Sequence, residues 1–182
     1  KMYTRKGTIL QALSEIMKNA EYFIKKLDLE KHPEGGYYRR IYQSDEMVNK
    51  SNLPERYDSD RFYSTSIYYL LNGNDVSKFH RLKSDEIWHY YFGSLVIIHI
   101  IDNFGNYTLE KLGPNLEENE NFQVIIPKNS YFAAEITEKN SFAIIGCTVS
   151  PGFDFEDFEL ASKNELLKKY PKHHKLIEKF SD

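Results

Sequence analysis

A histidine and a glutamate lie in the stretch of this chain that is richest in groups able to move a proton. The stretch is SKFHRLKSDEIWHYYFG, residues 77–93, and it contains His80 and Glu86. A neutral imidazole works as a general base near neutral pH when a second group fixes its tautomer, and a nearby carboxylate does this while raising the pKa of the imidazole. We therefore predict His80 as the catalytic base and Glu86 as the catalytic residue that orients it.

Both residues stand in runs of alternating apolar and polar side chains, a pattern typical of β-strands. A short polar turn at residues 83–85 separates the runs, so we expect an antiparallel hairpin that brings His80 and Glu86 together. If Glu86 points into a barrel, Trp88 does so too and His89 lies on the opposite face. We expect aromatic and polar neighbours to bind the substrate, namely Gln123, Tyr68, Trp88, Tyr131, Phe132, Lys78 and His89.

The spacing in this stretch resembles the first sequence motif of the cupins, in which two histidines precede a glutamate and then a glycine. His80, Glu86 and Gly93 match the first histidine, the glutamate and the glycine, whereas Leu82 stands at the second histidine. The resemblance implies a jelly-roll barrel, also called a double-stranded β-helix, and a metal shell that lacks this ligand.

A second stretch, FQVIIP at residues 122–127, resembles the second cupin motif. Asn129 replaces its glycine there, and Phe132 replaces its last ligand histidine. Because two of the metal-binding histidines are replaced, the resemblance implies that the chain uses no metal and no other cofactor. It also implies that Gln123 corresponds to a residue in the same strand of the metal-free dTDP-sugar 3,5-epimerases.

Two further segments, HPEGGYY at 32–38 and PGFDFEDFEL at 151–160, complete the resemblance to an RmlC-like cupin family of unknown function, similar in fold to dTDP-4-dehydrorhamnose 3,5-epimerase. The resemblance implies a homodimer that exchanges the strand 37–42. It also implies that Glu34 and Arg39 edge the pocket or a dimer contact. From the residues alone, the Pro and Gly of 32–36 indicate a sharp turn.

Three functions stay open at this point. The first is binding of a small polar metabolite, such as a sugar or sugar nucleotide, by a metal-independent isomerase or epimerase; the second is non-catalytic binding, and the third is a metal-dependent oxygenase. The epimerases place an arginine where this chain has Ser77, which weakens the sugar-nucleotide hypothesis because arginine suits diphosphate. His80 and Glu86 could also form a purely structural pair.

Size and composition restrict the fold and the partners. A length of 182 residues fits one domain, which we assign to 1–182. Aromatic residues make up 15% of the chain and favour a mainly β fold. A net charge of -3 without a basic face argues against nucleic acid as a partner. One cysteine and the lack of a long apolar run at the N-terminus lead us to expect a cytoplasmic protein that does not enter the membrane.

The expected elements follow the chain in order. Apolar residues at helical spacing predict a helical lead-in over 8–28, in one broken or two short helices, with Asn19 as an N-cap. A barrel is expected over 35–160, with an excursion loop at 43–60, and helices over 162–180 end the chain. The predicted strands, besides the two runs described above, are 37–42, 62–71, 95–101, 107–112, 122–126, 131–136 and 141–149.

Several residues with reactive side chains are predicted to be structural. Cys147 lies among apolar residues and is expected to be a small buried group. His99 lies in an apolar run and is expected in the core, bonded to a neighbour. In residues 151–159 we expect the phenylalanines to point inward and the carboxylates to remain in water.

Overall fold

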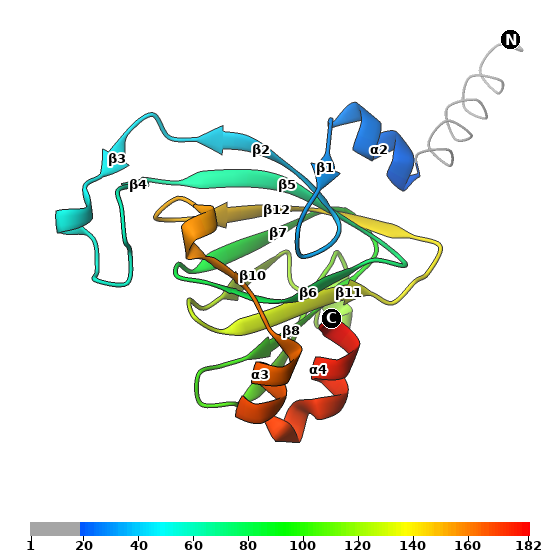
Figure 1. Cartoon of the computed structure of the whole chain (residues 1–182). Coiled ribbons are helices and arrows are strands. Elements are labelled where there is room, and N and C mark those ends of the chain that lie inside the picture. Colours follow the sequence, from blue (N-terminus) through cyan, green and yellow to red (C-terminus); the bar gives the residue numbers. More distant parts are fainter. Residues whose placement is uncertain (1–18) are drawn as a thin grey trace, which may run out of the picture.

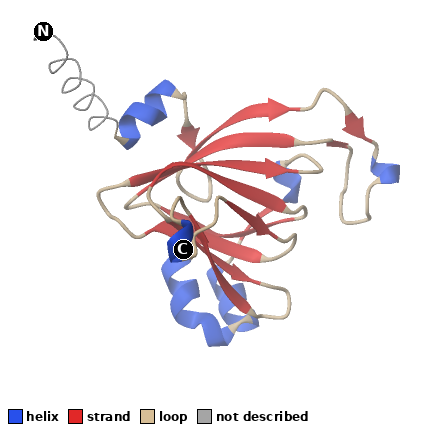
Figure 2. Ribbon diagram, turned by 180° about the vertical axis from the view of Figure 1, so that it is seen from behind, coloured by secondary structure: helices blue, strands red, loops and turns tan. Residues whose placement is uncertain are grey.

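A computed structural model describes residues 19–182 of the chain. Two antiparallel sheets lie face to face, and short helices cover their outer sides (Figure 1; Figure 2). The six-stranded sheet has the order β1 (Glu30–Lys31), β2 (Tyr37–Gln43), β5 (Thr65–Asn72), β12 (Phe142–Val149), β7 (Glu86–Gly93) and β10 (Gln123–Ile126). The five-stranded sheet has the order β13 (Phe158–Leu160), β6 (Val76–Leu82), β11 (Tyr131–Ile136), β8 (Val96–Ile101) and β9 (Tyr107–Leu112). The mainly β, antiparallel fold class is thus confirmed.

Helices stand at both ends of the described chain, as predicted. Helix α2 (Ala20–Lys26) begins at Asn19, whose side chain accepts a hydrogen bond from Tyr22 N at 2.9 Å. The predicted lead-in at 8–18 lies outside the described residues. Helices α3 (Lys163–Lys169) and α4 (His174–Phe180) pack on the outer side of the five-stranded sheet, α3 through Leu166 and α4 through Phe180. Short 3-10 turns are η1 (Lys50–Asn52), η2 (Leu116–Glu118), η3 (Phe155–Asp157) and η4 (Pro171–His173).

The space between the sheets is apolar at one end and polar at the other. Near the end of β7 the interior is filled by Val96, Leu112 and Ile136, all of them buried. Near the start of β7 the register places Val149 opposite Glu86, and Cys147 opposite Trp88. Alternation along each strand therefore brings titratable side chains inside at this second end.

The predicted hairpin between β6 and β7 is wrong, because the two strands belong to different sheets. His80 pairs with Phe132 and Leu160, whereas Glu86 pairs with Ile126 and Val149. Residues 83–85 cross from one sheet to the other, and the buried Ser84 hydroxyl anchors the crossing through Tyr57 OH at 2.8 Å. Two alternating runs joined by a short turn fit a hairpin within one sheet and a crossing between two sheets equally well. The sequence pattern could therefore not distinguish these two geometries.

The excursion between β2 and β5 is organised by its own short strands. β3 (Met47–Val48) pairs with β4 (Arg61–Phe62), and this ribbon projects beyond the ends of β2 and β5 (Figure 1). Within residues 19–182, β1 covers only Tyr37 and Tyr38 on the outer edge of β2, and no strand pairs with residues 39–43 on that edge. None of the helices within residues 19–182 has the length and apolar character needed to cross a membrane.

Candidate functional site

A cavity of about 40 Å³ lies between the sheets at their polar end. Space of this size holds a few water molecules or a compact chemical group. The cavity combines a polar set of side chains with an aromatic and aliphatic wall. Its lining consists of His32, Glu34, Tyr38, Arg40, Thr65, Ile67, Tyr69, His80, Leu82, Glu86, Trp88, Cys147, Val149, Phe153 and Phe158.

The partner of His80 is Glu34 and not Glu86. His80 Nε2 lies 3.0 Å from Glu34 Oε2, and both side chains are buried. His80 Nδ1 lies 2.7 Å from the carbonyl oxygen of Lys78, which can only accept, so Nδ1 carries a proton. The orienting role predicted for Glu86 is therefore filled by a backbone carbonyl. The predicted contact with Glu86 fails because the two strands lie in opposite sheets.

Glu34 reaches the cavity on a loop that only glycine permits. Gly35 and Gly36 have φ values of 119° and 66°, and a Cβ on Gly35 would stand 2.0 Å from Val76 O. This close approach lets the Glu34 carbonyl accept from Lys78 N at 2.9 Å, while Tyr69 OH donates to Gly35 O at 2.8 Å. The loop therefore extends the β6 surface and carries the Glu34 carboxyl to His80.

The Glu34 carboxyl is held in its ionised form. Burial alone raises its pKa, but the adjacent His80, the contact with His32 and the hydroxyl of Ser77 outweigh burial and lower the pKa to about 2. Ser77 Oγ donates to Glu34 Oε1 at 2.8 Å. The contact between Glu34 Oε2 and His80 Nε2 contains one proton, because two bare acceptors would repel each other at this distance.

His32 completes the polar group on this wall. Its Nδ1 lies 3.3 Å from Glu34 Oε2, and its ring meets Tyr38 edge to face at 4.6 Å between centroids. The sequence indicated a turn at 32–36 and suggested Glu34 as a pocket edge, and both predictions are confirmed. Sequence reasoning missed His32 itself. The signal was present in HPEGG, in which a histidine and a glutamate separated by one proline stand before two glycines that allow a close backbone approach.

Glu86 occupies the opposite wall in a different charge state. Burial raises the pKa of Glu86 to about 8, and the negative charge of Glu34 adds to this, while Trp88 and Cys147 oppose it. Glu86 is thus a neutral carboxylic acid at pH 7. The cavity therefore holds one ionised and one protonated glutamate. Two negative charges in the same buried space would repel each other, and burial together with this repulsion keeps the second carboxyl protonated.

Cys147 is buried, as predicted, and it also lines the cavity beside Glu86. Burial raises the pKa of its thiol well above the usual range, and the nearby carboxyls of Glu86 and Glu34 raise it further. A thiol in this state is a poor nucleophile.

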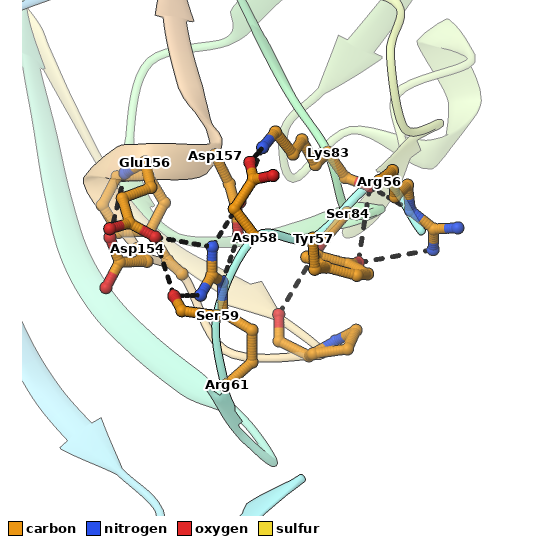
Figure 3. A network of polar contacts seen from close by, with 12 residues as sticks. Arg56, Tyr57, Asp58, Ser59, Arg61, Lys83, Ser84, Asp154, Glu156 and Asp157 are labelled. Atoms are coloured by element: carbon orange, nitrogen blue, oxygen red, sulfur yellow. Dashed lines mark hydrogen bonds and ion pairs between the residues drawn. The ribbon is translucent and has the colours of Figure 1, made fainter. Parts of the chain in front are cut away.

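The outer wall of the cavity is aromatic, and the segment that carries it is held by a buried ion pair between Arg61 and Asp157, which Figure 3 shows within its polar network. Phe153 and Phe158 line the cavity, and Asp157 between them binds Arg61 through Nε to Oδ2 at 2.6 Å and Nη2 to Oδ1 at 2.7 Å. The prediction that all carboxylates of this segment lie in water is wrong for Asp157, which is buried beside the guanidinium of Arg61. Phe155 is half exposed, contrary to the inward position expected for it.

Of the predicted substrate-binding residues, Trp88 lines the cavity, and Phe132 packs behind one of the lining side chains. The Trp88 ring lies 5.9 Å from that of Tyr69 and 6.1 Å from that of Phe132. Phe132 lies directly against His80, with 4.0 Å between ring centroids. The catalytic roles predicted for His80 and Glu86 stay predictions, although both side chains line the cavity.

The other predicted substrate-binding residues lie outside the cavity. Gln123 and His89 contact each other at 3.1 Å on the outer face of the six-stranded sheet, where Tyr68 meets Tyr91. The opposite orientation of His89 relative to Trp88 was predicted correctly. Tyr131 OH donates to Glu159 Oε1 at 2.8 Å, and Lys78 binds Asp182. Four of the five lie outside the cavity because their strand positions alternate with those that face inward, whereas Lys78 lies at a register irregularity of β6 that interrupts the alternation.

Two residues outside the cavity have structural partners. His99 is buried, as expected, with Nδ1 at 2.9 Å from Tyr107 OH. Arg39, predicted at a pocket edge or dimer contact, is exposed and donates to Leu27 O at 3.0 Å. Neither residue lines the cavity.

The side chains around His80 do not fit the metal site of the cupins. Leu82 lines the cavity and Phe132 covers the His80 ring, so two apolar groups stand where imidazoles would be needed. Both nitrogens of His80 already have partners inside the protein. Within residues 19–182, no three His, Cys, Asp or Glu side chains gather in a way that could hold a metal ion.

Comparison with known proteins places this geometry in a family. The model of the family described as Cupin superfamily (DUF985) matches residues 21–161. Protein SO0799 from Shewanella oneidensis is 40% identical, with a TM-score of 0.83 over 91% of this chain and 99% of that one. A hypothetical protein from Leishmania major is 31% identical, with a TM-score of 0.81 over 90% and 99%.

A more distant structure shares the fold alone. Oxalate decarboxylase from Bacillus subtilis is 15% identical, with a TM-score of 0.52 over 85% of this chain and 37% of that one. No curated protein matches the chain.

Proposed function

Because the chain belongs to the Cupin superfamily (DUF985) family, whose fold encloses a cavity between its sheets, we propose that it binds a small polar metabolite there and moves a proton on it. The activity is that of a metal-independent isomerase or epimerase. One arrangement carries the proposal: on one wall of the buried cavity the contacts of Glu34 with His80 and Ser77 lower its pKa despite burial, whereas on the other wall burial raises the pKa of Glu86. Pairs of titratable groups whose pKa values are driven apart are typical of acid–base sites.

The proton transfer is divided between the two walls. The His80–Glu34 pair takes a proton from a carbon next to a carbonyl group, and the neutral Glu86 gives its proton to the carbonyl oxygen. The C–H electron pair then becomes the new C=C bond of an enediol or enol. Return of a proton to carbon, with Glu86 recovering its own, completes an isomerisation or epimerisation with no external oxidant. His80 is the base in this scheme once the proton between Nε2 and Glu34 has left, and burial favours this loss because it lowers the pKa of His80 against the opposing charge of Glu34.

The size of the cavity favours a compact ligand. About 40 Å³ accommodates a group of a few heavy atoms, far less than a sugar nucleotide. The structure therefore supports a small hydroxylated metabolite over a nucleotide-linked one.

A second candidate, a non-catalytic binding protein, is favoured by one specific observation. Both nitrogens of His80 have hydrogen-bond partners within the chain, so a bound compound meets no free lone pair on the imidazole. A catalytic His80 would have to exchange Glu34 for the substrate during turnover. The metal-dependent oxygenase ranks below both, because Leu82 and Phe132 replace the extra ligands that such a site needs.

A two-stage experiment separates these functions. A metabolite library is first screened by thermal shift on the wild type, His80→Ala and His89→Ala, since a bound ligand raises the melting temperature by mass action. His89 is the matched control because it is a histidine outside the cavity. The hit is then incubated in D₂O, and loss of its C–H proton signal is followed by NMR. Exchange by wild type and His89→Ala alone supports the isomerase, and binding without exchange supports the binding protein.

The homodimer stays a prediction. Residues 39–43 of β2 have a free outer edge within the described chain, and an open edge of this kind can accept a strand from a second copy. We expect light scattering at micromolar concentration to give twice the mass of the chain, and a monomer would remove this prediction.

A further inference from the structure

The wall of the cavity opposite His80 carries a buried hydrogen-bond donor with no acceptor. Trp88 is 1% exposed and lines the cavity. Its Nε1–H makes no hydrogen bond in the part of the chain that the structure describes, although it lies near enough to the Glu86 carboxyl to oppose the rise of the Glu86 pKa. An indole N–H can only donate, and a buried donor without an acceptor destabilises the folded state. Such a group is normally satisfied by a ligand or by water.

A second donor lies beside the first. Glu86 and Trp88 are two positions apart on β7, so their side chains leave the same face of the strand. The Glu86 carboxyl is buried in the same cavity, and the charge of Glu34 across the cavity disfavours its ionisation. In its neutral form it presents an O–H group next to the indole N–H.

We propose that Trp88 Nε1–H and the Glu86 carboxyl form a subsite for one neutral carbonyl oxygen, so that the ligands of this cavity are small uncharged carbonyl compounds. The inference rests on the proposed function, because it assumes that the cavity binds a compact metabolite. A carbonyl oxygen has two lone pairs and can accept from both donors at once. A carboxylate in the same place would be repelled by the ionised Glu34.

An alcohol fits this subsite less well than a ketone. Its oxygen also accepts hydrogen bonds, but its own O–H then needs an acceptor. The rings of Tyr69 and Phe132 beside Trp88 offer no carboxylate, so this O–H must use the Glu86 carboxyl or reach Glu34 across the cavity. The subsite therefore selects the oxidation state of the ligand as well as its charge.

The test uses the fact that Trp88 is the single tryptophan of the chain. Its indole N–H gives one peak in a ¹H–¹⁵N NMR spectrum of the protein. Three compounds of the same carbon skeleton are titrated: hydroxyacetone, propane-1,2-diol and lactate. We expect hydroxyacetone to move the indole peak downfield and saturably, and to bind at least about tenfold more tightly than the diol, with lactate weakest.

Two variants of Glu86 sharpen the result. Glu86→Gln keeps an N–H donor in nearly the same shape, and we expect affinity for hydroxyacetone within about threefold of the wild type. Glu86→Leu removes the donor, and we expect a loss of about tenfold, in the range of one neutral hydrogen bond. His89→Gln, on the outer face, is the control and should change nothing. The indole peak confirms that each variant remains folded.

The outcomes separate this inference from the function on which it rests. Equal affinity for ketone and diol, or saturable binding that leaves the indole peak in place, would overturn the carbonyl subsite and leave the cavity as a binding site whose indole is satisfied by water. Failure of all three compounds to bind, together with an empty metabolite screen, would remove the proposed function itself.

Discussion

Two buried ion pairs of this molecule are built from similar chemistry and differ in their surroundings. The pair Arg61–Asp157 joins the β3–β4 ribbon to the segment before β13, and the pair His80–Glu34 joins β6 to the loop before β2. All four side chains are less than a tenth exposed. The guanidinium of Arg61 makes two short parallel bonds to Asp157 and donates further to Asp60 O and Glu156, so its donors are used within the protein.

The pair at His80 differs because it borders a cavity and because His80, unlike an arginine, can lose its proton near neutral pH. Arg61 stays charged in any protein environment, and its bonds to Asp157 raise its pKa further. A histidine and a glutamate can both hold the proton between them, and a cavity beside them gives a ligand access to it. A buried ion pair alone therefore does not indicate a functional site. A buried pair indicates one when it borders a cavity and contains a group that can lose its proton near neutral pH.

The largest effect is expected from breaking the pair at the cavity. His80→Ala should slow C–H exchange in the identified ligand by about two to four orders of magnitude, because proton transfer is a transition-state interaction. Glu34→Gln keeps the shape of the pair and guards against a folding defect in His80→Ala. Deuterium exchange followed by NMR measures both rates. Full exchange in both variants would place the base elsewhere.

The pair outside the cavity should affect stability instead. Arg61→Met leaves the Asp157 carboxylate buried without its partner, and we expect a loss of about 3–5 kcal/mol in the free energy of unfolding. The double variant Arg61→Met with Asp157→Leu removes both charges and should recover most of this loss. Urea titration measures each value. A single variant as stable as the wild type would show that this pair contributes nothing to the fold.

The protonated glutamate should make stability depend on pH in a defined direction. The pKa of Glu86 is raised to about 8 from 4.5, so between these values the folded protein keeps a proton that the unfolded chain has released. Stability therefore falls as the pH rises through this window, by at most about 1.4 kcal/mol per pH unit. Glu86→Gln should flatten this slope in urea titrations at pH 5, 7 and 8. An unchanged slope would mean that Glu86 is ionised in the folded protein.

The smallest effect is expected from removing metal. Because Leu82 and Phe132 replace imidazoles beside His80, EDTA should leave the melting temperature and the C–H exchange rate unchanged. Elemental analysis of protein purified without a histidine tag should find less than one transition metal per chain. One equivalent of iron, nickel or zinc would favour the oxygenase.

The comparison also shows what the sequence can predict. Alternation located strands such as 107–112 and 131–136 with the observed bounds, because each strand has one face in the core. The motif spacing placed His80, Glu86 and Trp88 at the cavity. The contact between Glu34 and His80 joins residues far apart in the sequence and leaves no local sequence pattern. Glu34 was therefore not recognised as the partner of His80. The assignment of all residues to a single domain stays a prediction.

The errors in the candidate site have one physical origin. Gln123, Tyr68 and Tyr131 have the residue types of a pocket, but type does not say which face of a strand a side chain leaves. Near Glu86 the face could be deduced from the alternation with Trp88 and His89. Elsewhere the register relative to the cavity depends on contacts between distant strands, and these appear only in three dimensions.

The long sequence separation of the strands that enclose the cavity has a consequence for how the protein folds. Arg61 and Asp157 are 96 positions apart, and β5 pairs with β12 across a similar distance. Chains dominated by such non-local contacts fold in about milliseconds to seconds, because long loops must close before any contact stabilises them. We expect Glu34, His80 and Glu86 to remain hydrated and to titrate normally until these strands meet. The proton held by Glu86 at pH 7 would then be taken up late, as the final sheet contacts form.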